Sequence, residues 1–346
     1  MKKYGSICSK AILTLTFMGL TLLLSSCGSS GKSPATVKDV YVAGLSNYAG
    51  TYWLNGTATT LAGSDFARNI VISGTDIYVS GYSFPNGQSV ATYWKNGTAV
   101  TLTDGTHLAT AEAIAVSGTD VYVAGYESNG LHMVAKVWKN GTATALSDGT
   151  HDAYAFAMTV SGSDVYVAGS EYTPTSASPG VSPATAKYWK NGTATALTDG
   201  TKYAEADCIF VSGTDVYVSG SESNGTNGVA TYWKDGVATA LTDGTHNAWG
   251  VSLALAGTDV YVAGFESNGT NGVVKVWKNG GATAYTDGTH DAAALGMAIS
   301  GTDIYVAGYE SNGSNEVAKY WKNGTAVVLT DGTREGQAWS VFVNVE

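Results

Sequence analysis

Two short phrases recur seven times along this chain of 346 residues. The first contains a tryptophan, usually followed by Lys-Asn-Gly, and its copies lie 41, 44, 51, 44, 44 and 44 residues apart, at Trp53, Trp94, Trp138, Trp189, Trp233, Trp277 and Trp321. The second, Asp-Val-Tyr-Val-Ala-Gly or a near copy, precedes each tryptophan and begins at Asp39, Asp76, Asp120, Asp164, Asp215, Asp259 and Asp303. A period of this length predicts a ring or a stack of like units, because one such unit cannot bury its apolar faces alone.

The unit that contains Trp138 reads as four short strands. Val, Tyr, Thr and Trp dominate it, and no stretch shows the 3.6-residue period of a helix. Asn140-Gly141 indicates a type I′ hairpin turn between the third and fourth strands, since both turn positions need positive φ. Each unit therefore predicts one antiparallel sheet, whose strands in this copy cover residues 111–116, 121–124, 134–138 and 142–146.

The strands and the two chain ends favour a closed ring over a solenoid. The second strand is apolar on both faces, with valines on one and Tyr122 and Ala124 on the other, as expected for blades packed face to face. The first unit lacks a first strand and starts at residues 40–43, whereas residues 337–343 form a first-strand phrase at the other end. We therefore predict an all-β fold, a seven-bladed β-propeller over residues 39–346 with four antiparallel strands per blade, closed by the C-terminal strand joining the first blade.

Residues 113–126, Ala-Ile-Ala-Val-Ser-Gly-Thr-Asp-Val-Tyr-Val-Ala-Gly-Tyr, carry a resemblance to known proteins. The phrase resembles the propeller-repeat families found in bacterial surface proteins, which have an Ile-Ala-Val strand, a turn and a Tyr-Val-Thr/Ala-Gly-Tyr strand. The resemblance implies the propeller fold and a surface setting, and it implies no particular activity.

The N-terminal segment has the features of a targeting signal rather than of a folded element. Three lysines among the first ten residues precede an apolar run over residues 11–24, which is the layout of a secretory signal. Leu24-Ser25-Ser26-Cys27 then resembles the lipobox of bacterial lipoproteins. The resemblance implies that residues 1–26 are a signal peptide, that Cys27 carries diacylglyceryl and palmitate groups, and that residues 27–38 form a lipidated, flexible tether. The alternative is an ordinary or uncleaved secretory signal.

The same resemblance and the overall charge set the expected surroundings and partners. Gly28 rather than Asp follows the cysteine, which points to the outer membrane of a bacterial cell envelope. The lipid bilayer is thus one expected partner, through the N-terminal acyl anchor, and we expect a monomer. A nucleic-acid partner is not expected, because the formal net charge is −10 and no Lys/Arg cluster offsets it.

The long polar loops predict where a ligand would bind. In a propeller, the loop between strands two and three and the loop to the next blade share one face, while the tight Ser-Gly-Thr-Asp and Asn-Gly turns occupy the other. We expect a site on the loop face near the axis. The candidate ligand-binding residues there are His107, Glu127, His151, Asp152, Tyr154, Glu171, Lys202, Tyr203, Glu222, His246, Trp249, Glu266, His290, Asp291, Glu310, Arg334 and Trp339. Residues 172–183 lengthen one loop on this face.

The recurring histidines admit three interpretations. We favour structural His/Glu pairs within each blade, because a histidine stands 31 residues before the next strand-three tryptophan in three blades. This spacing is similar to the His–Trp network of WD-repeat propellers, although Thr-His and Trp-Lys replace Gly-His and Trp-Asp. The alternatives are an axial ring of ligands and a Zn or Mn site, since imidazole and carboxylate bind both metals. We assign no catalytic residue, metal or cofactor.

Nearly identical blades favour a binding role over catalysis. We expect a non-catalytic interaction propeller that faces the surface or the periplasm and binds a glycan or an envelope protein. Catalysis needs an asymmetric set of groups, which near-copies do not supply. One alternative is still a polysaccharide lyase or hydrolase with an axial site, built from carboxylates such as Glu112, Glu205 or Asp207. Another is a structural scaffold in an envelope complex.

Overall fold

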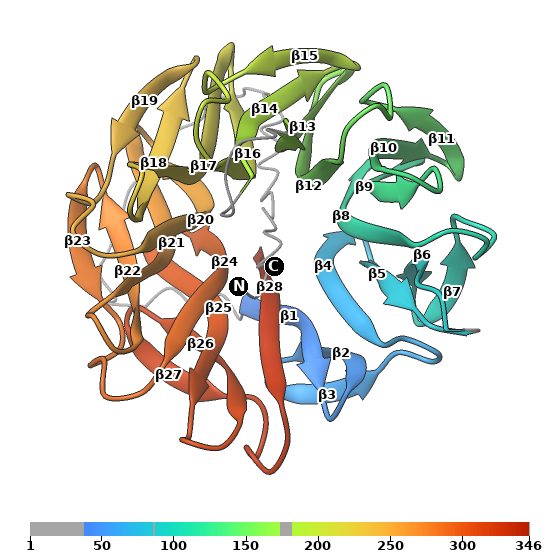
Figure 1. The fold of residues 1–346 in the computed structure, drawn as a ribbon. Coiled ribbons are helices and arrows are strands. Elements are labelled where there is room, and N and C mark those ends of the chain that lie inside the picture. The colour runs from blue at the N-terminus through green and yellow to red at the C-terminus, as the bar shows by residue number, and fades with distance from the viewer. Residues whose placement is uncertain (1–37, 86, 174–181, 346) are drawn as a thin grey trace, which may run out of the picture.

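The computed structural model describes residues 38–85, 87–173 and 182–345, and this part of the chain forms seven four-stranded antiparallel sheets around one axis (Figure 1). The prediction of a seven-bladed β-propeller is confirmed. From the axis outward, blade one consists of β28 (Gly336–Val345), β1 (Lys38–Ser46), β2 (Ala49–Leu54) and β3 (Thr57–Thr60), and blade two of β4 (Phe66–Ser73), β5 (Asp76–Ser83), β6 (Val90–Lys95) and β7 (Thr98–Thr101). Blade three consists of β8 (Ala109–Ser117), β9 (Asp120–Ser128), β10 (Met133–Lys139) and β11 (Thr142–Ala145). Blade four consists of β12 (Ala153–Ser161), β13 (Asp164–Tyr172), β14 (Ala184–Lys190) and β15 (Thr193–Ala196).

Blades five to seven follow the same order. They consist of β16 (Ala204–Ser212), β17 (Asp215–Ser223), β18 (Gly228–Lys234) and β19 (Val237–Ala240); β20 (Ala248–Ala256), β21 (Asp259–Ser267), β22 (Gly272–Lys278) and β23 (Gly281–Ala284); and β24 (Ala292–Ser300), β25 (Asp303–Ser311), β26 (Glu316–Lys322) and β27 (Thr325–Val328). The inner two strands are longer than the apolar phrases predicted, because polar residues at both ends continue the ladder.

Within the described residues there is no helix that is long and apolar enough to cross a bilayer. The predicted signal peptide over residues 1–26, the lipid attachment at Cys27 and the tether as far as residue 37 lie outside the described residues. Most of the long loop predicted at residues 172–183 lies outside them as well.

The last strand of the chain closes the ring, as predicted. Strand β28 pairs antiparallel with β1, with Tyr41 opposite Phe342 and Val42 opposite Val341. Both valine side chains are buried. Because the innermost strand of blade one comes from the C-terminus and the other three from the N-terminus, the ring has no unpaired inner edge in this blade.

The Asn-Gly turns have the backbone that a type I′ turn requires. In blade three, Asn140 has φ 49° and Gly141 has φ 83°. The Asn140 side chain also accepts a hydrogen bond from the Val121 backbone N–H at 2.9 Å and donates one to Asp120 at 2.8 Å. Asparagine therefore does more here than tolerate positive φ, because it fastens the outer hairpin to the start of the second strand.

Tryptophans on the third strands fill the space between blades. All seven are at most 1% exposed, and Trp138 of blade three packs against Val71 and Tyr78 of blade two. The interpretation of these residues as inter-blade core is thereby confirmed. Burial of so large a ring in every junction stabilises the contact of each blade with its neighbour.

Every innermost strand carries a β-bulge at the same place. In blade three the register shifts between Ala111 and Ala113, so that Glu112 is the extra residue. The glycine of each Tyr-Val-Ala-Gly phrase makes room for it, since a Cβ on Gly125 would lie 2.0 Å from the Thr110 carbonyl oxygen. The seven extra residues, one from each blade, are Arg68, Glu112, Phe156, Asp207, Val251, Leu295 and Trp339.

Polar side chains next to several bulges tie neighbouring blades together. Ser340 accepts a hydrogen bond from the Asn69 amide at 3.0 Å, and Asn69 in turn accepts one from the Ile114 backbone N–H at 3.1 Å. Ser252 accepts one from the Met297 backbone N–H in the same way. These bonds cross the apolar junctions between blades close to the axis. They fix the position of each inner strand along the axis relative to the inner strand of the next blade.

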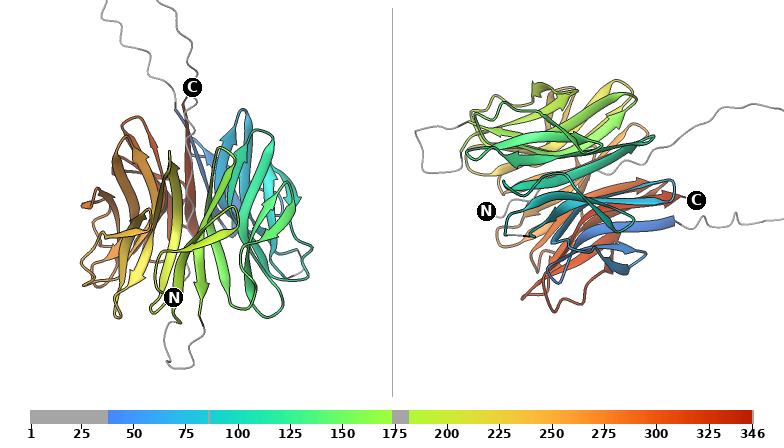
Figure 2. Two further views of the ribbon diagram at one scale, coloured as in Figure 1. Left: turned by 90° about the horizontal axis from the view of Figure 1, so that it is seen from above. Right: turned by 90° about the vertical axis from the view of Figure 1, so that its right-hand side faces the viewer.

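The two faces of the disc differ as the sequence predicts. Tight turns join strands one to two and three to four on one face, and longer loops occupy the other. Lys38 pairs with Val345, so β1 begins and β28 ends on the tight-turn face. Figure 2 shows β28 ending there. The described chain therefore begins at Lys38 and ends at Val345 on the tight-turn face, opposite the loop face.

Candidate functional site

Bulge side chains from several blades meet at the centre of the ring. The Arg68 guanidinium carbon lies 4.1 Å from the centre of the Trp339 ring, and Trp339 belongs to one apolar cluster with Val251 and Leu295. The side chain of Arg68 is 11% exposed and that of Glu112 is 2% exposed. Asymmetry therefore enters this repetitive fold at its centre, where each blade contributes a different residue.

An ion pair occupies one side of this ring. Arg68 Nε lies 3.5 Å from Glu112 Oε2, and Tyr82 and Tyr126 lie near the pair. Burial is the largest influence and lowers the pKa of the Arg68 guanidinium, but Glu112 together with Tyr82 and Tyr126 outweighs it, so that the pKa is raised. Burial and the negative charge of Glu112 likewise raise the pKa of Tyr126. The ion pair thus lies in a site from which water is largely excluded.

A second group lies at blades four and five, and we name Tyr154, Tyr172, Tyr203, Glu205 and Asp207 the tyrosine–carboxylate cluster. The ring centres of Tyr154 and Tyr172 are 5.6 Å apart and those of Tyr172 and Tyr203 are 6.0 Å apart, in both cases edge to face. The Tyr172 hydroxyl donates a hydrogen bond to Glu205 at 3.4 Å. Three aromatic rings and Glu205 thus come together from β12, β13, β16 and the loop before β16, and Asp207 joins them through its electrostatic interaction with Glu205.

The carboxylates of this cluster are buried, whereas its tyrosines are half-buried. Glu205 is 6% exposed and Asp207 is 2% exposed. Burial, and next the negative charge of Glu205, raises the pKa of Asp207 well above its usual range. Burial also raises the pKa of Tyr154 to about 12. Glu205 and Asp207 lie two residues apart on β16, and the negative charge of Glu205 opposes the ionisation of Asp207.

Stacked aromatic pairs stand on other blades at the same level. Trp249 lies parallel to Phe265 with ring centres 5.1 Å apart, and Phe66 lies parallel to Tyr82 with ring centres 4.8 Å apart. Trp249 is half-buried, so part of its ring faces solvent on the loop face. Four predicted candidates, Trp249, Trp339, Tyr154 and Tyr203, are therefore among the residues that gather around the axis, although Trp339 is buried beneath Arg68.

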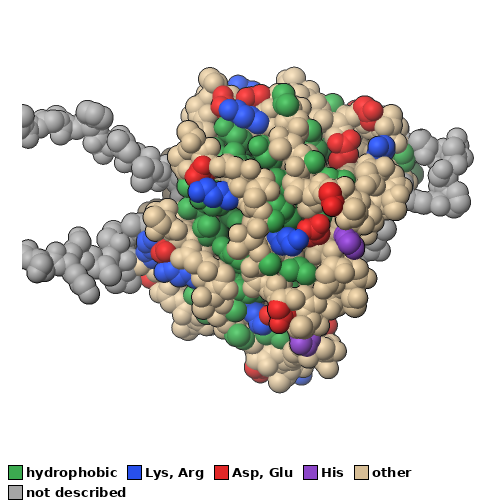
Figure 3. Space-filling model, turned by 90° about the vertical axis from the view of Figure 1, so that its left-hand side faces the viewer, with side chains coloured by type: hydrophobic (Ala, Val, Ile, Leu, Met, Phe, Trp, Pro, Cys, Tyr) green, Lys and Arg blue, Asp and Glu red, His purple; other side chains and the backbone are tan. Residues whose placement is uncertain are grey.

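The histidines lie elsewhere, and the favoured interpretation of them is wrong. His107, His246 and His290 are exposed and His151 is half-buried, and the ring nitrogen Nδ1 of each is 3.1–3.2 Å from the hydroxyl of the preceding threonine. Figure 3 shows histidine side chains at the outer surface. Trp94, whose preceding inter-blade loop has no histidine, donates a hydrogen bond from Nε1 to the Ala62 carbonyl oxygen.

The recurring glutamates pair with lysines rather than histidines. Lys136 of β10 binds Glu127 of β9, and the same ion pair recurs as Lys187–Glu171, Lys275–Glu266 and Lys319–Glu310. Blade five has Thr231 in place of the lysine, so Glu222 stands without this ion pair. The predicted His/Glu pairs are thereby corrected. The spacing could not reveal this, because the lysine is adjacent only after the strands pair.

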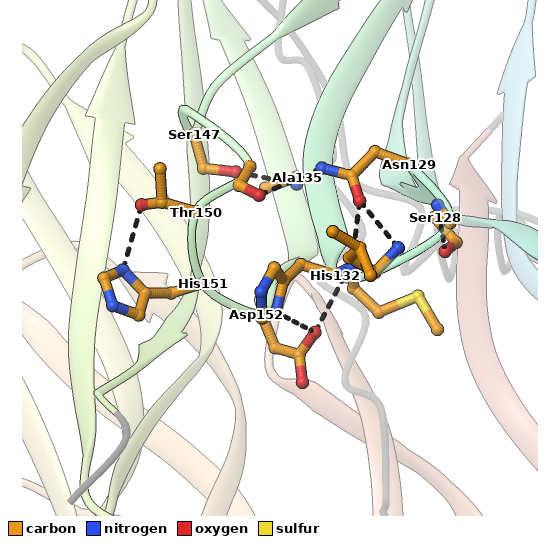
Figure 4. Close-up of polar contacts among 12 residues, drawn as sticks. Ser128, Asn129, His132, Ala135, Ser147, Thr150, His151 and Asp152 are labelled. Carbon is orange, nitrogen blue, oxygen red and sulfur yellow. Dashed lines mark hydrogen bonds and ion pairs between the residues drawn. The ribbon is translucent and has the colours of Figure 1, made fainter.

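The remaining candidates occupy the loop rim. Asp152 and Asp291 accept hydrogen bonds at 2.8 Å from the backbone N–H groups of Met133 and Gly272, and His132 lies 3.5 Å from Asp152 (Figure 4). Lys202 and Arg334 are exposed. Through the described ranges, no three His, Cys, Asp or Glu side chains come close enough together to hold a metal ion. The rim therefore offers single polar groups, each serving its own loop.

A hollow of different character opens at the tight-turn end of the axis. Its lining includes Val71, Ile114, Met158 and Phe342. These side chains are aliphatic or aromatic, and no charged residue is among those that line it. Charged groups of the tight-turn face, such as the ion pair Lys139–Asp120, do not line this hollow, so the charged groups near the axis lie at the bulge level and toward the loop face.

Sequence reasoning missed four residues of the axial region. Arg68, Tyr82, Tyr126 and Tyr172 were not among the candidates, and Glu112, Glu205 and Asp207 entered only as an alternative. A signal for them exists in the sequence. When the seven units are aligned on the strand-two glycine, the column of bulge residues and the column two positions before it each hold seven different amino acids, whereas the column between them holds only Ala or Gly.

Comparisons with known proteins support the architecture. No family model matches the chain, and no curated protein matches it in sequence. Among solved structures, it is similar to the acylaminoacyl peptidase of Pyrococcus horikoshii in its orthorhombic crystal form, with a TM-score of 0.52 and 11% sequence identity. The match covers 85% of this chain and 51% of the peptidase chain, so the chain spans about half of that protein's length. At this identity the likeness shows the fold alone.

Proposed function

We propose that this protein is a non-catalytic binding propeller of the bacterial cell envelope, whose ligand is a glycan held on the loop face near the axis. The observation that carries the proposal is the arrangement of the bulge column. Seven near-copies keep one scaffold, while the bulge residues differ in every blade. Beside them, half-buried Tyr154 and Tyr203 lie near the buried Glu205, and half-buried Trp249 stacks on Phe265. Aromatic faces beside acceptor groups are a common way to bind sugars, since the rings cover C–H faces and the acceptors take hydroxyl protons.

The envelope location is part of the same proposal. It rests on the resemblance of residues 24–27 to a lipobox and on the apolar run before them. The surface setting agrees with the resemblance of residues 113–126 to repeats of bacterial surface proteins. A lipid anchor would hold the propeller at the outer membrane and leave the rigid ring to bind.

The binding site is tested by glycan-array and calorimetric measurements on the full chain in detergent. We expect Trp249→Ala and Tyr154→Ala each to weaken binding of the best glycan about tenfold, as loss of one stacking ring does. Tyr48→Ala is the matched control, because Tyr48 is 64% exposed and lies in the β1–β2 loop of the same face, away from the bulge column. Binding that is unaffected by the first two changes, or equally weakened by the third, would contradict the proposed site.

One observation favours an enzyme as the second candidate. Asp207 is a buried carboxyl whose pKa is raised well above its usual range, which keeps it protonated under conditions in which a general acid has to donate. A polysaccharide lyase or hydrolase could use such a group together with Glu205. The test is turnover of envelope polysaccharides by the wild-type chain and by Asp207→Asn. Turnover that depends on Asp207 would replace the binding proposal, and no turnover in either protein would retain it.

A further inference from the structure

The tyrosine–carboxylate cluster has a chemical character of its own. One oxygen of Asp207, Oδ1, is buried and has no hydrogen-bond donor within the described part of the chain. The groups that shift the pKa of this carboxyl are burial and Glu205, and no Lys, Arg or His contributes. The cation nearest in the bulge column, Arg68, is engaged by Glu112 and Trp339. Asp207 is therefore a buried acceptor that the protein itself leaves unsatisfied.

We propose that the tyrosine–carboxylate cluster binds the ammonium group of an amino sugar. The inference rests on the proposed glycan-binding function and names the chemical class of its ligand. An ammonium has three donors for the carboxylate oxygens, and its positive charge offsets the cost of ionising Asp207, which releases its proton to solvent when the ligand binds. The sugar ring to which the ammonium is attached presents C–H faces to the tyrosines. The ammonium also gains from the negative faces of aromatic rings, and the cluster supplies three, with Tyr172 5.6 Å from Tyr154 and 6.0 Å from Tyr203 between ring centres.

The composition of the cluster argues against an inorganic cation. Calcium takes six to eight oxygen ligands, whereas this cluster offers two carboxylates and phenol groups. No third acidic or imidazole ligand joins them anywhere in the described residues. Aromatic rings are poor ligands for a strongly hydrated metal ion and good neighbours for an organic ammonium, whose charge is spread and whose attached carbons are apolar.

The test compares two oligosaccharides that share one backbone. A chitosan pentamer carries free ammonium groups at pH 6, and a chitin pentamer carries neutral N-acetyl groups in their place. We expect calorimetry on the full chain in detergent at 150 mM salt to show binding of the chitosan pentamer at least about tenfold tighter than of the chitin pentamer, as a charge-assisted hydrogen bond supplies. Asp207→Asn should remove this preference about tenfold, and Tyr172→Leu should weaken chitosan binding by a similar factor.

Asp235→Asn is the matched control, because it removes one negative charge from the β18–β19 turn of the same blade, on the tight-turn face opposite the loop face, at a position where other blades have asparagine. Chitosan affinity unchanged in this variant but reduced by Asp207→Asn supports the inference. Equal loss in both variants shows attraction to the overall negative charge and overturns it. Equal affinity for the two pentamers overturns the ammonium preference while glycan binding stands. Failure of both pentamers to bind, together with a negative glycan array, removes the proposed function as well.

Discussion

Removing the C-terminal strand should open the ring. In the variant that ends at Glu335, blade one loses β28, whose side chains Trp339, Val341, Phe342 and Val343 are each at most 9% exposed. Burial of one large apolar side chain stabilises a fold by about 1.5–3 kcal/mol, so the four contribute about 6–12 kcal/mol. The free energy of unfolding of a whole domain is about 5–15 kcal/mol, so the loss is of the same size as the total.

The expected result is a protein that melts at least about 10 °C lower and self-associates through the exposed edge of β1. Circular dichroism melts and size-exclusion chromatography measure the two effects. A synthetic peptide of residues 336–346 should restore the melting temperature by adding the missing strand. A peptide with Val341→Lys should not restore it, because Val341 is fully buried between blades. Unchanged melting after truncation would refute the argument that this strand holds the ring closed.

Three further predictions concern single side chains. Arg68→Met leaves Glu112 buried without its partner and should lower the free energy of unfolding by about 3–5 kcal/mol at pH 7 in urea titrations, and adding Glu112→Leu should recover most of it. The pKa of Asp207 is raised by burial and by Glu205, so the folded protein binds more protons than the unfolded chain above pH 4 and loses stability as the pH rises. Asp207→Asn should flatten that decline in melting temperature between pH 4 and pH 8. Asn140→Ala should cost about 1–2 kcal/mol in the same titrations, because alanine disfavours the φ of 49° found there, while Asn140→Gly should cost less.

The fold could be predicted from the sequence because its rules are local and repeat. Asn140-Gly141 sets one hairpin, the alternation around Tyr122 sets a strand buried on both faces, and the spacing of the tryptophans counts the blades. The unmatched phrases at the two ends predicted the β28–β1 pairing. Each of these signals is a property of a short stretch, and the ring follows from combining them.

The candidate site was less predictable because it depends on where side chains point after the strands pair. A one-residue bulge turns Arg68, Glu112 and Asp207 toward the axis, and the residues alone do not say where the extra residue lies. The prediction that the histidines pair with glutamates was wrong for the opposite reason. Their regular spacing reflected the period of the repeat, while the lysine that meets Glu127 comes from the neighbouring strand. Recurrence in a repeat protein thus indicates scaffold, and departure from it indicates the place to search.

The position of Lys38 bears on how the disc would stand above a bilayer. If Cys27 is held in lipid, the eleven residues to Lys38 reach at most about 40 Å, and they join the propeller at the tight-turn face. That face would be drawn toward the headgroups, and the half-buried tyrosines and Trp249 would look outward into the aqueous space. A bulky polymer could then approach the axis without having to pass between the protein and the membrane that carries it.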